Sequence, residues 1–384
     1  MCQLHMNRSY RIIPCYTGDV SGVCSALFEL GGMVVIHDPS GCNSTYNTHD
    51  ETRWYDQDSL IFISGLAEID AVMGNDEKLI SDVVDAAVEL QPKFIALANS
   101  PIPFLNGTDF EAISRVIERR TGIPTFYLPT NGMHDYIVGA SEALAEIARR
   151  FVSEPKEKRP KTVNLLGITP LDFTHPDAPQ SLRTLVETAG FEVLSCWAMG
   201  DDLDALSKAS EASVNLVVSA VGLQAAKVLK ERFGKPYVVG FPVGAFRETV
   251  YSAMKSGEDA YPMRTLTQPT DEETILIGEP VTMGSIAAAM GLLNGKIPRV
   301  LCPLEQCKEL FSPNMASVVG EEEIETALRD AKVVIADPLY RPICPADARF
   351  LSLPHEALSG RIFHKSIPNI ADLNLRSFLE GANT

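Results

Sequence analysis

Short apolar segments alternate with amphipathic helical periods along almost the whole chain. Four segments in the first part have the length and composition of buried strands: 32–36, 60–64, 93–98 and 124–128. Between the last three of these segments, the stretches 77–90 and 109–120 carry apolar residues at helical spacing. Strand–helix–strand units with short connections form parallel sheets covered by helices. The sequence therefore predicts an α/β protein.

Two polar stretches divide this pattern into three units of similar build. The first, 153–161, is charged, contains two prolines and has no apolar residue, so it is expected to be a linker. The second, 256–273, also holds two prolines. A chain of 384 residues exceeds one ordinary core. We expect three α/β units, at about 1–155, 160–257 and 270–384.

Charge and composition exclude several classes of function. The net charge of −17, with no basic stripe, argues against a nucleic-acid partner. No apolar run reaches membrane-spanning length, and the N-terminus has no apolar signal-peptide core. We therefore expect a cytoplasmic protein without a membrane partner. Its eight cysteines are then expected to be thiols or metal ligands rather than disulfides.

Cys15 and Cys42 each lie in a Gly-rich turn ahead of a predicted helix. The amides at a helix N-terminus stabilise a thiolate, and thiolates are the usual ligands of iron–sulfur clusters. Two cysteines are half of a four-cysteine set, which suggests that a second chain supplies the others. The alternative is two small buried side chains in turns, since free cysteine is commonly buried.

The stretch from Cys15 to Cys42 resembles the N-terminal cluster region of the nitrogenase component 1 family. The shared features are a cysteine before a helix, a hydrophobic strand and the motif H-x-P-x-G-C, present here as H-D-P-S-G-C. Similar runs include A-V-M-G-N-D-E-K-L at 71–79, N-S-P-I-P-F-L-N-G-T-D-F at 99–110 and A-D-P-L-Y-R at 336–341. The family includes molybdenum–iron protein subunits, their cofactor-assembly relatives and nitrogenase-like reductases.

The resemblance implies a fold, a cofactor and partners. The fold would be three Rossmann-like parallel-sheet domains. Cys15 and Cys42 would bind an iron–sulfur cluster, [4Fe–4S], shared with a second copy or with a sister subunit of the same fold. An ATP-dependent iron–sulfur reductase, similar to the nitrogenase iron protein, would deliver low-potential electrons for an unidentified substrate. No P-loop is present, so no nucleotide is expected on this chain itself.

Two departures from the family pattern bear on the chemistry. Ser100 stands where the family has its third cluster cysteine, and a neutral hydroxyl is a poor iron ligand. We expect Ser100 to lie beside the cluster without ligating it in the resting state. The stretch 215–222 lacks the cysteine that holds the molybdenum cofactor in the nitrogenase catalytic subunit, and no counterpart of that cofactor's histidine ligand is evident. Dinitrogen reduction is therefore not expected.

Other interpretations of the sequence stay open. The chain is alternatively a scaffold or carrier for metallocofactor assembly, or a cluster-free protein that binds a tetrapyrrole or metal complex. Several residues near the predicted cluster either line a substrate pocket and relay protons or lie in solvated loops: His49, Asp50, Arg53, Trp54, Asn131, His134 and Tyr136. His37 either orients the cluster turn by hydrogen bonds or is a satisfied buried histidine. The remaining internal cysteines are expected to be packed or surface thiols: Cys24, Cys196, Cys302, Cys307 and Cys344.

Overall fold

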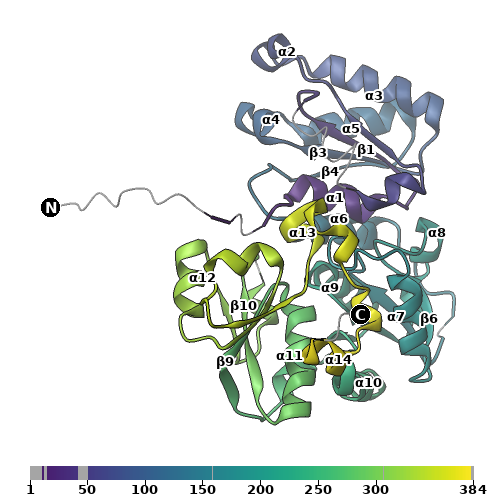
Figure 1. The fold of residues 1–384 in the computed structure, drawn as a ribbon. Helices are drawn as coiled ribbons and strands as arrows, with labels where there is room; N and C mark the ends of the chain where they lie inside the picture. The colour runs from purple at the N-terminus through teal and green to yellow at the C-terminus, as the bar shows by residue number, and fades with distance from the viewer. Residues whose placement is uncertain (1–10, 13–14, 42–50, 158, 306, 382–384) are drawn as a thin grey trace.

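The computed structural model describes residues 11–12, 15–41, 51–157, 159–305 and 307–381. Its strands form three separate sheets, and every strand pair in them is parallel (Figure 1). The predicted α/β class is confirmed. Cys42, His49 and Asp50 lie outside the described residues. Within those residues, no helix has both the length and the apolar character that crossing a membrane requires.

The first sheet has the order β2-β1-β3-β4. Its strands are β1 (Met33–His37), β2 (Leu60–Ile63), β3 (Ile95–Asn99) and β4 (Thr125–Leu128). Both central strands, β1 and β3, are buried along their full length. One face packs on α3 (Asp76–Leu90) and α5 (Phe110–Thr121), and the other on α1 (Asp19–Leu27) and α6 (Tyr136–Arg150). Helices on both faces explain why these two strands are apolar at every position but the last, rather than at alternate positions.

Two short helices of the first unit were not predicted. They are α2 (Glu68–Met73), which follows β2, and α4 (Pro101–Asn106), which follows β3. No residue of α2 is buried, and in α4 only Pro103 is. Each spans only six residues, which is too short for apolar spacing to establish a helix from the sequence.

The second sheet has the order β6-β5-β7-β8. Its strands are β5 (Thr162–Leu166), β6 (Glu192–Cys196), β7 (Val214–Val217) and β8 (Tyr237–Val239). The helices of this unit are α7 (Ala178–Glu187), α8 (Leu203–Leu206), α9 (Leu223–Phe233) and α10 (Arg247–Ser256).

The third sheet has the order β11-β10-β9-β12-β13. Its strands are β9 (Thr270–Ile277), β10 (Ile297–Cys302), β11 (Met315–Ser317), β12 (Val333–Ala336) and β13 (Arg349–Ser352). The helices α11 (Pro280–Asn294) and α12 (Glu321–Leu328) belong to this unit. The two edge strands, β11 and β13, were not predicted, because they are short and largely unburied.

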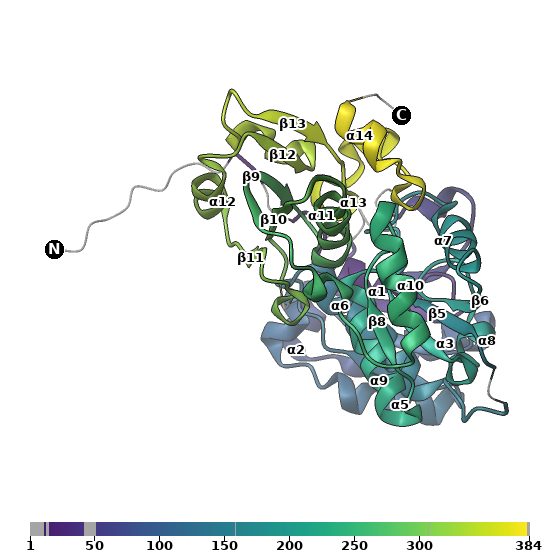
Figure 2. The same cartoon turned by 90° about the horizontal axis from the view of Figure 1, so that it is seen from below.

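After β13 the chain leaves the third sheet and returns to the other two units. The short helix α13 (Glu356–Ser359) places the Ala357 carbonyl against the first unit, where it accepts from Tyr16 N at 3.1 Å and Thr17 N at 3.2 Å. Further on, α14 (Leu375–Glu380) lies beside α10 and α11 (Figure 2). Each sheet falls within one predicted unit, while the exact boundaries 1–155, 160–257 and 270–384 remain predictions.

A buried arginine joins the first and second units. Arg53 donates to Glu51 Oε1 at 2.8 Å, Glu29 Oε1 at 2.9 Å and the Ala198 carbonyl of the second unit at 2.9 Å. Its guanidinium also lies over the Phe28 ring. Arg53 is therefore structural rather than a solvated loop residue or part of a substrate pocket. Removing the cation of a buried ion pair strongly destabilises the fold, because the carboxylate stays buried without a compensating charge.

Replacing Arg53 by alanine should lower the free energy of unfolding by about 3–5 kcal/mol, because Glu51 would remain buried and uncompensated. Urea denaturation followed by circular dichroism measures this change. Lys78→Ala, which removes an exposed ion pair with Asp82, serves as the control and should change stability little. Equal effects of the two substitutions would contradict a structural role for Arg53.

Candidate functional site

The carboxyl ends of β1 and β3 meet at Ser100. This residue is fully buried and directly precedes α4. Its hydroxyl oxygen lies 2.8 Å from the His37 carbonyl and 2.5 Å from Asp38 Oδ1. The hydroxyl therefore contacts the end of β1, which is the strand that leads through Gly41 to Cys42.

The N-terminus of α1 is fastened to the same edge. The Asp19 carboxylate is buried and accepts hydrogen bonds from Asn131 N and Gly132 N, each at 2.9 Å. Gly132, at φ +71°, lies so close to Pro101 that a Cβ atom would be 2.8 Å from the proline ring. The segment that carries Cys15 and the segment that carries Ser100 thus both contact the loop that contains Asn131 and Gly132.

Cys15 lies in a partly buried and acidic environment. Its Sγ is 3.5 Å from the carbonyls of both Thr17 and Ala357. Burial, followed by the charge of Asp135, raises the pKa of this thiol to about 12. Helix α1 begins only at Asp19, so its amides do not offset this effect. Burial and the nearby acids thus disfavour the thiolate form of Cys15 more than its backbone hydrogen bond at Thr17 favours it. That Cys15 ligates iron stays a prediction.

The other described residues near this edge have structural partners. His37 Nδ1 lies 2.7 Å from Ser64 Oγ, and burial lowers its pKa to about 4, so the ring is neutral. Asn131 Oδ1 accepts from Met133 N at 2.8 Å. His134 Nδ1 lies 2.8 Å from Glu305 Oε2 of the third unit.

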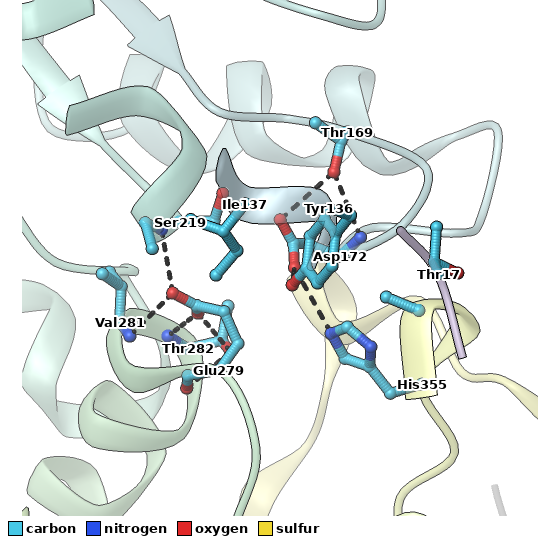
Figure 3. A network of polar contacts seen from close by, with 12 residues as sticks. Thr17, Tyr136, Ile137, Thr169, Asp172, Ser219, Glu279, Val281, Thr282 and His355 are labelled. Carbon is cyan, nitrogen blue, oxygen red and sulfur yellow. Dashed lines mark hydrogen bonds and ion pairs between the residues drawn. The ribbon is translucent and has the colours of Figure 1, made fainter. Parts of the chain in front are cut away.

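The structure reveals a buried polar network that was not predicted, at the junction of the three units (Figure 3). Tyr136 donates its hydroxyl to Asp172 Oδ1 at 2.5 Å. On the other side, His355 Nε2 lies 3.4 Å from the same oxygen, an ion-pair distance without hydrogen-bond geometry. Of these three residues, the sequence singles out only Tyr136. Asp172 and His355 come from loops that follow β5 and β13, and a position after a buried strand is the signal that could have found them.

Glu279 extends this network and links the third unit to the second. Its Oε1 accepts from Ala220 N at 2.8 Å and Val281 N at 3.0 Å, and its Oε2 accepts from Thr282 N at 2.7 Å. Burial and then the nearby Asp172 raise the pKa of Glu279 to about 7. Burial opposes a charged His355, yet its pKa is raised overall, because Asp172, Asp337 and Glu279 favour the imidazolium.

This arrangement can hold protons close to Cys15. Tyr136 N donates to the Thr17 carbonyl at 3.0 Å, two residues from Cys15, and His355 precedes the Ala357 carbonyl that contacts Cys15 Sγ. A cavity of about 140 Å³ next to Ile137 is lined by residues of all three units, among them Val138, Leu223 and Cys307. Tyr136, Asp172, Glu279 and His355 do not themselves line this cavity, although the neighbouring Ile137 does.

The described part of the chain contains no group of three or more histidine, cysteine or acidic side chains placed to hold a metal ion. Cys24, Cys196, Cys302 and Cys307 are buried free thiols, and Cys344 is a half-buried one. A complete four-thiolate site is therefore not formed within these residues.

Comparison with known proteins identifies the family. The sequence profile described as nitrogenase component 1 type oxidoreductase matches residues 21–253, more than half of the chain. The chain belongs to this family. Among solved structures, it is similar to one titled "Nitrogenase Cp1 at pH 6.5", with a TM-score of 0.71 at 15% identity over 99% of this chain and 94% of the other. At that identity the likeness shows the fold alone.

Curated relatives of the chain include both reductases and assembly proteins. It is 27% identical over 218 residues to one of the subunits of the light-independent protochlorophyllide reductase of Prosthecochloris aestuarii. It is 27% identical over 226 residues to the nitrogenase molybdenum–iron protein alpha chain of Azospirillum brasilense. It is 24% identical over 220 residues to the iron-molybdenum cofactor biosynthesis protein NifE of Methanosarcina barkeri. The matches cover 53–55% of this chain but only 39–46% of those proteins.

The raised pKa of Glu279 predicts a pH-dependent contribution to stability. Between pH 4.5 and about 7 the carboxyl ionises in the unfolded chain but stays protonated in the folded one. The contribution of this carboxyl group to the free energy of unfolding is therefore fully present below pH 4.5 and is lost as the pH rises to about 7. Relative to Glu279→Gln, the wild type should lose about 2–3 kcal/mol over this range.

Urea denaturation at a series of pH values measures this difference. Glu187→Gln, at an exposed position without an ion-pair partner among the described residues, is the control and should show no such trend. A constant difference between wild type and Glu279→Gln would contradict the raised pKa.

Proposed function

We propose that this chain is a subunit of a nitrogenase-like oxidoreductase that holds a [4Fe–4S] cluster at a subunit interface. It would receive low-potential electrons from an ATP-dependent iron–sulfur reductase and pass them to a substrate. Membership of the family carries this proposal, supported by the position of Cys15 beside the first sheet, at whose edge Gly41 leads to Cys42. The relatives named as oxidoreductases support the same class of reaction.

The residues present fit such a cluster as half of its ligand set. Cys15 would bind iron by losing its proton, and the charge of a bound metal lowers a ligand's pKa by several units. Cys42, outside the described residues, would be the second ligand. Ser100 would support the site without ligating, because its hydroxyl contacts the end of β1. A cluster bound there would supply one-electron transfer.

The chain's own residues would supply protons near the site. Reduction of an organic substrate consumes protons as well as electrons. Tyr136, Asp172 and His355 form a buried set, in which Tyr136 N donates to the Thr17 carbonyl and His355 lies two residues before Ala357, whose carbonyl contacts Cys15 Sγ. This role is proposed from their contacts and burial, and the substrate itself is not identified.

An exposed apolar surface supports a dimer. Six side chains of α2 and α4 are 38–78% exposed: Ile69, Val72, Met73, Ile102, Phe104 and Leu105. The two helices are joined by Asn106 Nδ2, which donates to the Ala71 carbonyl at 3.0 Å. We call this the α2–α4 surface. Apolar patches of this kind are uncommon on monomers, and this one adjoins Ser100. We propose that a second copy, or a sister subunit of the same fold, covers it and completes the cluster.

A second candidate function is a scaffold for metallocofactor assembly. The similarity to a cofactor biosynthesis protein favours it, as does the serine in place of the family's third cysteine. A scaffold would release its metal complex to an acceptor protein. An oxidoreductase would retain iron through repeated cycles of reduction and oxidation. Iron retained on the chain after such cycles therefore distinguishes the two.

The cluster proposal is tested by the iron and sulfide content after anaerobic reconstitution. Cys15→Ala and Cys42→Ala should each lose most of the iron, because each removes one of the two ligands. Cys344→Ala, which removes another half-buried thiol, is the control and should keep it. Ser100→Ala should also keep its iron. Equal losses in Ser100→Ala and Cys42→Ala would show that Ser100 is a ligand, and unchanged iron in Cys15→Ala would contradict the site.

The dimer proposal is tested by placing charges on the α2–α4 surface. Val72→Glu with Leu105→Glu should weaken association at least about tenfold, because unpaired carboxylates would be buried between subunits. Both side chains are more than 70% exposed, so the fold should tolerate the change. Anaerobic analytical ultracentrifugation measures association, and Val319→Glu, 81% exposed on the third unit, is the control. A double variant that dimerises like the wild type would refute this interface.

A further inference from the structure

A second cavity, of about 490 Å³, is lined by residues of the second and third units and of the C-terminal segment. Its walls come from α7, the loop after β8, the first residue of α10, the C-terminal half of α11 and residues 371–376. The volume is within the range of small-molecule sites. It is separate from the network around Glu279 and from the Cys15 region.

Two arginines line this cavity without ion-pair partners. Arg247, the first residue of α10, uses its Nε to donate to the Gly244 carbonyl at 2.7 Å. Among the described residues, no carboxylate lies within ion-pair distance of Arg247 or of Arg376 on α14. Most buried or clustered arginines of this acidic chain do have such partners, as Arg53 and Arg183 show.

The single acidic residue of the lining does not neutralise them. Asp372 Oδ2 accepts hydrogen bonds from Ser181 Oγ and Asn369 Nδ2, both at 2.7 Å. These contacts fasten the C-terminal segment to α7. The cavity is therefore positively charged on balance, in a protein of net charge −17.

The rest of the lining is mostly apolar and well packed. Gly244 has a φ of +50°. A Cβ atom at this position would lie 3.3 Å from the Ala289 side chain and 3.5 Å from the Leu375 side chain, so the loop, α11 and α14 are in close contact. Apolar side chains form most of the remaining wall: Leu185, Val243, Ala289, Leu293 and Leu375. In addition, no side chain caps the N-terminus of α10, where Arg247 stands. Helix amides there favour an anion.

We propose that this cavity binds a small organic anion, with a carboxylate or phosphate held by Arg247 and Arg376 and an apolar body against the aliphatic wall. Guanidinium groups bind both kinds of oxyanion by paired hydrogen bonds. The site requires the second and third units and the C-terminal segment. It does not rest on the proposed cluster, and iron-free protein should bind the anion equally well.

The test is calorimetric titration of the full chain with benzoate, phenyl phosphate and benzyl alcohol. Binding of either anion, and not of the neutral alcohol, is expected, and the preferred anion distinguishes a carboxylate ligand from a phosphate ligand. Arg376→Ala and Arg247→Gln should each weaken binding about tenfold or more, since a hydrogen bond to a charged group contributes about 1.5–3 kcal/mol. Arg329→Ala, at an exposed arginine outside the cavity, is the matched control.

A filling substitution separates binding in the cavity from binding elsewhere. Ala245 is exposed and lines the cavity, so Ala245→Trp should fold normally and abolish binding. Thermal denaturation checks that each variant is folded. The proposal is overturned if neither anion binds, if benzyl alcohol binds as tightly, or if Arg376→Ala and Ala245→Trp bind like Arg329→Ala.

Discussion

The close crossing of α1 and α6 is the contact on which the rest of the junction depends. A Cβ at Gly22 would lie 2.2 Å from the Tyr136 carbonyl, and one at Gly139 would lie 1.9 Å from the Asp19 carbonyl. Only glycine permits backbones to approach in this way. The crossing brings Asp19 to the amides of Asn131 and Gly132, and it aims the Tyr136 hydroxyl at Asp172 of the second unit. Cys15, just before α1, is placed by the same contact.

Near that crossing, several acidic side chains are buried with few cationic side chains beside them. Arg53 compensates Glu51, but among the described residues Asp172 has the neutral Tyr136 and Thr169 hydroxyls and the ion-pair contact of His355. Burying such groups is costly unless a proton is kept. Burial and the nearby Asp172 raise the pKa of Glu279 to about 7, and the charges of Asp172, Asp337 and Glu279 raise that of His355 against the effect of burial. Protonation of either group reduces the net negative charge of the junction.

The sequence was most informative where a segment's structure depends on its own apolar pattern. The strands β1, β2, β3 and β4 were predicted within a residue or two of their observed ends, because a short apolar run is enough to indicate a strand. It failed for α2 and α4, which bury almost nothing. The polar network was missed because Tyr136, Asp172, Glu279 and His355 are distant along the chain and meet only through the packing of three units. The acidic neighbours that raise the pKa of Cys15 were missed for the same reason, since they come from elsewhere in the sequence.

At position 100, a serine in place of the family's cysteine changes the ligands that the site can offer but not the fold around it. A cysteine here would offer a third thiolate, which is what the family resemblance leads one to expect. The serine instead lies 2.8 Å from the His37 carbonyl and 2.5 Å from Asp38 Oδ1, contacts at which a thiol is a weaker donor. The position thus stabilises the turn that leads to Gly41 and Cys42. Since a hydroxyl used in this way is not free to bind iron, the chain would offer two thiolates rather than three. A ligand set of that size depends on a partner subunit for its completion, so the apolar α2–α4 surface beside Ser100 and the loss of the third cysteine point to the same requirement.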